Sequence, residues 1–128
     1  MSEPVAAESL DGIWKRRSPN YPDHDEFMCI DEVRRRIVCF VHISVDPVKV
    51  VPMRMWYEPD SSASIKVRHK PTDEARSNAY RFEDGKLIWK WVGSEYGWDR
   101  ASPENHPDWL NERLGHAHAK MDETEKGA

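Results

Sequence analysis

Hydrophobic and polar residues alternate with a period of two along much of the chain between residues 10 and 100. Residues 50–58 place four apolar side chains on one face of an extended segment, namely Val51, Met53, Met55 and Tyr57. Residues 63–69 show the same alternation, and residues 37–45 form an apolar run rich in β-branched side chains. Both patterns favour strands with at least one buried face.

Residues 80–91 predict a β-hairpin. Asp84 and Gly85 form the two-residue loop that a tight hairpin favours. The register that follows pairs Tyr80 with Trp89, Phe82 with Leu87 and Glu83 with Lys86. One face of the hairpin is then apolar and aromatic, and the other is charged.

The pattern of residues 27–41 fits either a helix or two strands. Their apolar positions also match a helical stripe, but residues 38–43 are poor in strong helix formers. We therefore favour two strands joined by a hairpin centred on Arg34. The basic cluster of residues 34–36 then forms a solvated hairpin tip, or alternatively contacts an anion or a partner.

The same hairpin register sets Cys29 directly opposite Cys39. This position permits either a packed pair of free thiols or a cross-strand disulfide. We favour free thiols, because no export signal indicates an oxidising compartment.

Near the end of the chain, apolar residues recur at helical spacing. Trp109, Leu110 and Leu114 predict a short helix that begins near Pro107 and ends at Gly115. We expect residues 1–9 and residues 116–128 to be disordered tails, because both are small, polar or charged. Residues 10–115 would then be a single domain.

Seven or eight short strands in succession, followed by one helix, favour a mainly β protein. We expect an antiparallel meander that forms a small barrel or a rolled sheet, with one short C-terminal helix. A chain of 128 residues with 38% hydrophobic and 33% charged residues has the composition of one globular domain.

The charge and the apolar runs exclude several functions. The chain has 19 Lys and Arg against 23 Asp and Glu, a net charge of −4, so we expect no nucleic-acid binding. No apolar run approaches the ~20 residues that cross a bilayer. The first residues carry no signal-peptide pattern, and we therefore expect no membrane association and a cytoplasmic location.

The predicted ordered region opens with Leu10-Asp11-Gly12-Ile13-Trp14-Lys15, which contains a Gly-X-Trp element, and Arg100 follows near the end of the last predicted strand. This pair of features resembles the lipocalin and calycin superfamily of small β-barrels. The resemblance implies that Trp14 begins the first strand and plugs the closed end of the barrel. It also implies that Arg100 packs over Trp14, and that the structural residues of this end are Gly12, Trp14 and Arg100.

The six tryptophans could line an aromatic cavity, or they could fill the core of a small barrel, which is the alternative that we favour. In the first case, the barrel would bind a small apolar or amphipathic ligand without catalysis. Arg54, beside Trp56, is our candidate for holding an acidic group of that ligand. The further candidates for the pocket wall are Met53, Met55, Tyr80, Trp89 and Trp91.

Two other functions stay open. One alternative is a packed interaction module of the immunity or adaptor type, with exposed aromatic residues or a sheet edge as the binding surface for a protein partner or for a second copy in a homodimer. Alternatively, His42 or His69 could face a cavity with Tyr57 or Glu58 and serve an isomerase or dehydratase. We expect no cofactor and no metal, because His116 and His118 lie in the presumed tail.

Overall fold

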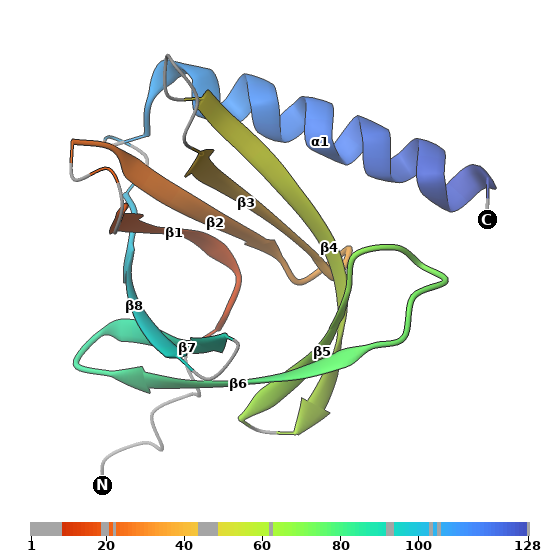
Figure 1. The fold of residues 1–128 in the computed structure, drawn as a ribbon, viewed down its shortest axis with the longest axis horizontal. Coiled ribbons are helices and arrows are strands. Elements are labelled where there is room, and N and C mark those ends of the chain that lie inside the picture. Colours follow the sequence, from red (N-terminus) through yellow and green to blue (C-terminus); the bar gives the residue numbers. More distant parts are fainter. Residues whose placement is uncertain are drawn as a thin grey trace, which may run out of the picture.

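The computed structural model of the chain is a closed antiparallel barrel with a helix on its outside (Figure 1). It describes residues 9–18, 21, 23–43, 49–61, 63–91, 94–102, 104 and 106–127. The strands follow one another around the barrel as β1 (Gly12–Arg17), β2 (Asp25–Asp31), β3 (Arg36–Ile43), β4 (Lys49–Ser61), β5 (Ser64–Arg68), β6 (Arg76–Glu83), β7 (Lys86–Trp91) and β8 (Ser94–Arg100). The expected meander barrel is therefore confirmed.

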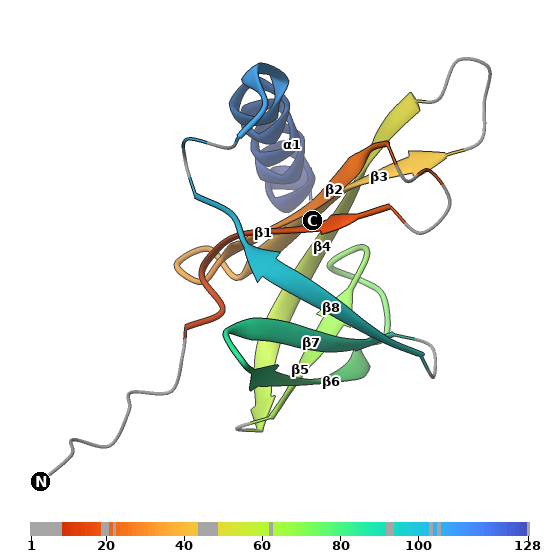
Figure 2. The ribbon, with the colours of Figure 1, turned by 90° about the vertical axis from the view of Figure 1, so that its left-hand side faces the viewer.

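The barrel closes where the first strand meets the last. Figure 2 shows β8 between β1 and β7. The β1–β8 register joins Trp14 with Arg100 and Lys15 with Asp99. Just beyond this ladder, the backbone N–H of Ala101 donates to the carbonyl of Ile13 at 2.8 Å. These bonds remove both free edges of the sheet.

The β6–β7 hairpin has the register that the sequence predicts. Tyr80 lies opposite Trp89 and Phe82 lies opposite Leu87. Asp84 and Gly85 both have positive φ, at 53° and 79°. Two successive left-handed residues are the geometry of a type I′ turn, whose twist matches that of the strands.

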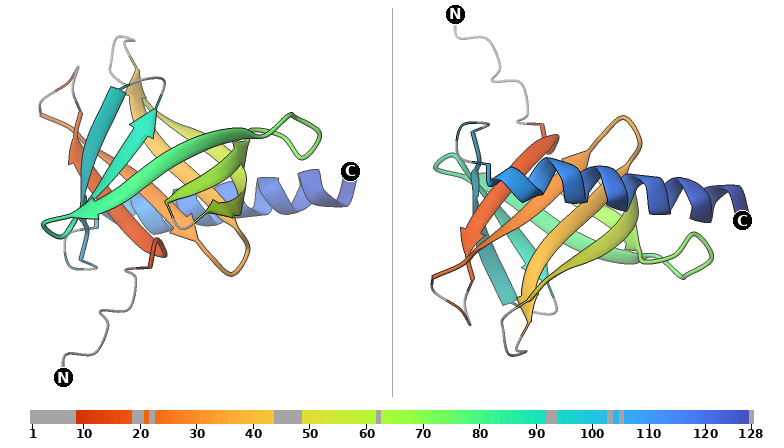
Figure 3. Two further views of the ribbon diagram at one scale, coloured as in Figure 1. Left: turned by 90° about the horizontal axis from the view of Figure 1, so that it is seen from below. Right: turned by 90° about the horizontal axis from the view of Figure 1, so that it is seen from above.

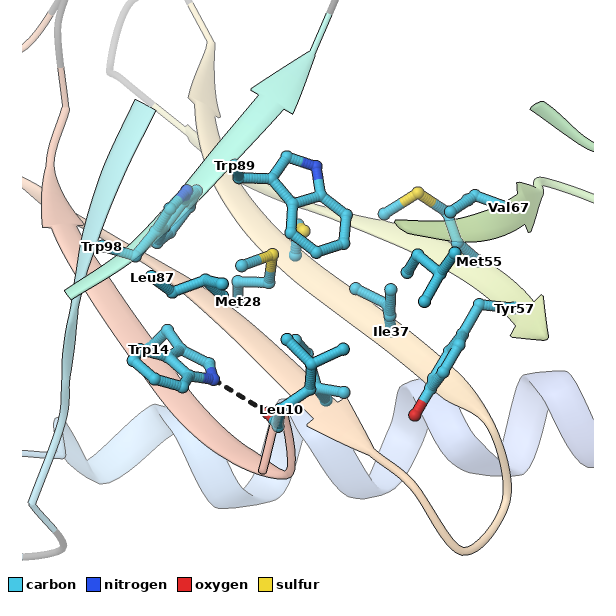
Figure 4. Packing of buried hydrophobic residues seen from close by; sticks show 13 residues of the cluster. Leu10, Trp14, Met28, Ile37, Met55, Tyr57, Val67, Leu87, Trp89 and Trp98 are labelled. Atoms are coloured by element: carbon cyan, nitrogen blue, oxygen red, sulfur yellow. Dashed lines mark hydrogen bonds between the residues drawn. The ribbon is translucent and has the colours of Figure 1, made fainter. Parts of the chain in front are cut away.

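Inward-facing residues of seven strands, together with Leu10, form the interior cluster, and the partly buried Tyr80 and Phe82 of β6 pack against it (Figure 4). Because alternate side chains of a strand point to opposite faces, Met55 and Tyr57 of β4 lie inside the barrel, as predicted. The interior cluster contains Leu10, Trp14, Met28, Ile30, Ile37, Cys39, Met55, Tyr57, Ile65, Val67, Leu87, Trp89 and Trp98.

The outer faces of β2, β3 and β4 carry a second apolar set, which helix α1 (Asp108–Gly127) covers (Figure 3). This outer cluster joins sheet residues such as Phe27 and Phe40 with Leu110 and Met121 of the helix. The rings of Phe27 and Phe40 both meet Trp109 edge-on, with centroids 5.8 and 5.6 Å away. The strands β2 and β3 are therefore buried on both faces, whereas the outer face of β4 is only partly covered.

Helix α1 is longer than the sequence predicted. It continues through Gly115 to Gly127, so the expectation of a disordered tail over residues 116–128 is wrong for residues 116–127. Ala117 and Met121 extend the buried stripe of Leu110 by about three further turns. Their packing against the sheet outweighs the roughly 1 kcal/mol by which glycine disfavours a helix interior.

The register of the β2–β3 hairpin is shifted by one residue from the predicted register. Its ladder sets Met28 opposite Cys39 and Cys29 opposite Val38. A shift of one residue turns a side chain to the other face of the sheet. Cys39 therefore lies in the interior cluster and Cys29 in the outer cluster, and both are free thiols rather than a disulfide.

The basic cluster at this hairpin is also divided between two environments. Arg34 and Arg35 are exposed, as predicted for a hairpin tip. Arg36 instead lies beneath helix α1 and is only 2% exposed. Its guanidinium donates to Asp122 at 2.6 Å and also to Glu125, so these two carboxylates compensate the buried charge.

The ordered second half of helix α1 gives a first prediction. Met121→Ala leaves a cavity at a side chain that is 0% exposed, and we expect the free energy of unfolding to fall by about 2–4 kcal/mol. The neighbouring exposed variant Lys120→Ala should change it by less than about 0.5 kcal/mol. Chemical denaturation of both variants provides the measurement. Equal, small effects would contradict the packing of this half of the helix.

The Arg36 network predicts a pH dependence. The hydrogen bond from Arg36 lowers the pKa of Asp122 below its usual value. The resulting stabilisation is therefore fully present above the pKa of the unfolded state, about 3.9, and is lost as the pH falls through the lower pKa of the folded state.

We expect Asp122→Asn to lower the free energy of unfolding at pH 7 and to have a progressively smaller effect as the pH falls towards 2, because protonation of Asp122 removes its charge interaction with Arg36. Denaturant titrations at the two pH values test this. Glu112→Gln, an exposed helix position, is the control. A destabilisation by Asp122→Asn that persists unchanged at pH 2 would argue against the charge interaction.

Candidate functional site

The interior of the barrel contains a cavity of about 200 Å³. Apolar and sulfur-containing side chains provide most of its wall, with two tryptophans on adjacent strands, Trp89 on β7 and Trp98 on β8. The residues that line it are Arg16, Met28, Cys39, Val41, Met53, Met55, Trp89, Tyr96 and Trp98. Figure 4 shows Trp89, Trp98, Met28 and Met55 grouped in this region of the interior.

Arg16 of β1 is the cationic side chain in the cavity wall. It follows Trp14 by two residues and therefore shares the inner face of the strand. Its guanidinium lies over the rings of Tyr96 and Trp98, with 4.5 and 4.6 Å to their centroids. These contacts hold the cation against the aromatic wall.

Glu26 neutralises this cation. Its Oε1 accepts hydrogen bonds from Nε and Nη2 of Arg16, at 3.1 and 2.9 Å. Its Oε2 accepts from the backbone N–H of His42 at 3.0 Å. Glu26 is 4% exposed, so the ion pair is desolvated and each partner depends on the other.

The indole of Trp98 adds a polar atom to the cavity wall. Trp98 is 5% exposed, and its Nε1–H has no acceptor among the described residues. Trp14 differs, because its own indole N–H donates to the carbonyl of Leu10 at 2.9 Å. Trp98 therefore lines the cavity and carries a buried donor that no described residue satisfies.

Cys39 lines the cavity as a neutral group. Burial raises the pKa of its thiol to about 12. The protonated thiol is a poor nucleophile, and together with the methionine thioethers it makes a soft, polarisable wall. Cys39 therefore contributes packing surface rather than reactivity.

Four of the predicted wall residues lie in the interior. Met53, Met55 and Trp89 line the cavity itself. Tyr80 lies beside it, with its ring stacked on Trp89 at a centroid distance of 6.1 Å. The side chain of Trp91 lies outside the described residues.

Arg54 and Trp56 lie on the other face of β4, so the prediction that they contact a ligand in the cavity is wrong. Met53, Met55 and Tyr57 point inward, and alternation turns Arg54 and Trp56 outward. Trp56 packs in the outer cluster, and its indole N–H donates to Glu125 at 3.3 Å. The interior arginine is Arg16, which the same alternation counted from Trp14 could have found.

The two candidate catalytic histidines are separated. His42 lies on the outer face of β3, where its ring is 4.7 Å from that of His24 and borders a 360 Å³ pocket shared with His106. Burial and the neighbouring His24 lower the pKa of His42. His69 is exposed and borders a different pocket, beside Arg54. The prediction that both face one cavity with Tyr57 is therefore wrong.

Trp14, Gly12 and Arg100 form the contact that the sequence resemblance implied. The Arg100 guanidinium lies 4.1 Å from the ring centroid of Trp14. It donates from Nη1 to the carbonyl of Asp11 and from Nη2 to that of Ser9, both at 2.9 Å. A Cβ on Gly12, whose φ is +125°, would lie 2.9 Å from Nη1 of Arg100. Glycine is therefore required at this position.

Comparisons of the chain with models of known protein families, with curated proteins and with solved structures found no match. None of the described helical residues forms a segment long and apolar enough to span a membrane. In the described part of the chain, no three His, Cys, Asp or Glu side chains are grouped so that they could hold a metal ion.

The Trp14–Arg100 contact predicts that Arg100 stabilises the barrel closure. Arg100→Ala should lower the free energy of unfolding by about 1–2 kcal/mol. Arg100→Lys should also be destabilising, because an ammonium cannot cover the indole and reach both carbonyls as the planar guanidinium does. Arg54→Ala, on the exposed face of β4, is the matched control and should have little effect. Urea denaturation tests the three variants, and full rescue by lysine would contradict the geometry.

Proposed function

We propose that this chain is a lipocalin-like barrel that binds a small apolar or amphipathic ligand in its interior cavity. The observation that carries the proposal is the cavity of about 200 Å³ among buried aromatic and methionine side chains. A concave apolar site with a few polar atoms is the usual form of a small-molecule site. The packing of Arg100 on Trp14 supports the lipocalin-like assignment.

The volume of the cavity limits the size of the ligand. An engineered apolar cavity of about 150 Å³ in another protein holds benzene. A space of about 200 Å³ therefore suits a molecule with one ring and a short substituent. Met28, Met53 and Met55 line this space, and flexible thioether side chains adapt to a somewhat larger ligand.

The two alternative functions have less support. The barrel is closed, so the strands offer no sheet edge of the kind that an interaction module would use. Val33 is the single large hydrophobic side chain that is strongly exposed among the described residues. For an enzyme, neither His42 nor His69 lines the barrel cavity. We therefore place the working surface inside the barrel.

A variant that fills the cavity tests the proposal. Val41 lines the cavity, and Val41→Trp should lower the affinity for ethylbenzene by about tenfold or more, because the new indole occupies the volume of the ligand. Val33→Trp introduces the same side chain at an exposed hairpin tip and should leave the affinity unchanged. Ethylbenzene binding is followed by NMR titration, with circular dichroism as the check that both variants fold.

Native mass spectrometry of the freshly purified protein provides a second measurement. A defined extra mass that is lost under denaturing conditions would identify the class of ligand. A protein that carries no extra mass and also fails to bind ethylbenzene would contradict the proposal.

A further inference from the structure

Two polar groups in the cavity wall indicate which ligand chemistry the cavity selects. The first is the indole N–H of Trp98, a buried donor without an acceptor among the described residues. A buried donor that stays unsatisfied costs about 1–3 kcal/mol. A ligand with an acceptor atom near Trp98 would remove this cost, whereas a pure hydrocarbon would not.

The second group is Arg16, whose charge is already compensated. Two of its nitrogens, Nε and Nη2, donate to Glu26, and its remaining Nη1 donates to no described residue. The pair of Arg16 and Glu26 is neutral as a whole. It can therefore offer a hydrogen bond from Nη1 to a ligand without offering a net positive charge.

We propose that the cavity selects neutral ligands that carry one hydrogen-bond acceptor, such as the carbonyl oxygen of an aromatic ketone, aldehyde or ester. The inference rests on the proposed function and specifies its ligand class. The acceptor lies beside the N–H of Trp98, within reach of Arg16, and the flat apolar part lies among Trp89 and the methionines.

The same geometry disfavours a carboxylate ligand. A carboxylate beside Arg16 would be close to the carboxylate of Glu26, which is only 4% exposed. Two anions would then share one buried cation, and the second would lose its hydration without an equivalent charge partner. A neutral carbonyl avoids both costs and still accepts the hydrogen bond.

Three one-ring probes of similar size test the inference. Ethylbenzene has no acceptor, acetophenone has a neutral carbonyl, and benzoate has a charged carboxylate. We expect acetophenone to bind about tenfold more tightly than ethylbenzene, since it satisfies the buried donor. Benzoate should bind more weakly than acetophenone. The indole N–H resonance of Trp98 in a ¹H–¹⁵N spectrum should shift with acetophenone in a manner that ethylbenzene does not reproduce.

Two variants assign the selectivity to these residues. Trp98→Phe keeps an aromatic ring but removes the donor, and the advantage of acetophenone over ethylbenzene should disappear. Glu26→Gln keeps the shape of the side chain but leaves Arg16 with a net charge, and benzoate affinity should rise by about tenfold relative to acetophenone. Glu83→Gln is the matched control, because Glu83 is exposed and pairs with Arg81 at the β6–β7 turn.

The outcomes separate the inference from the proposed function. If the three probes bind equally, or if benzoate binds the unaltered protein most tightly, the acceptor inference is wrong and the cavity remains a binding site. A Trp98 indole resonance that responds identically to acetophenone and ethylbenzene also overturns the inference, without requiring any variant to fold. If no probe binds, the proposed function fails and the inference fails with it.

Discussion

The barrel depends on one short seam, where β1 and β8 pair. The ladder there joins Trp14 with Arg100 and Lys15 with Asp99, and it closes a sheet whose other strands pair along the chain in order. Arg100 strengthens this seam, since its guanidinium covers the Trp14 ring and bonds to two carbonyls of the segment before β1. Without the closure the sheet would have two free edges and no enclosed interior.

Closure also divides the side chains into two separate cores. Inward residues form the interior cluster, and outward residues of β2, β3 and β4 form the outer cluster under helix α1. The helix therefore covers the outer faces of β2 and β3 and part of that of β4 without entering the barrel. Arg36 lies at this boundary, where Asp122 and Glu125 of the helix compensate its buried charge.

That interior combines a large apolar wall with very few polar atoms. Arg16 and Glu26 satisfy each other, and the aromatic rings of Tyr96 and Trp98 hold the cation in place. The N–H of Trp98 is the polar group that the described protein leaves without an acceptor in this wall. A low-dielectric environment makes such an unsatisfied group costly, and under the proposed function the same group would give specificity for a ligand that carries an acceptor.

The sequence by itself determined the local structure of this protein. Period-two alternation predicted several of the strands, the Asp84-Gly85 turn predicted the register of β6 and β7, and the family resemblance implied the packing of Arg100 over Trp14. The tertiary structure alone determined how neighbouring elements pack, and therefore which face of the sheet each side chain occupies. The register of the β2–β3 ladder differs by one residue from the predicted register. As a result, Cys29 lies on the outer face of the sheet and Cys39 on the inner face. Packing of helix α1 against the sheet stabilises the residues after Gly115 as a continuation of the helix. Alternation counted from the buried Trp14 could have placed Arg16 inside the barrel, but only the pairing of neighbouring strands showed that Arg54 lies on the outer face of β4.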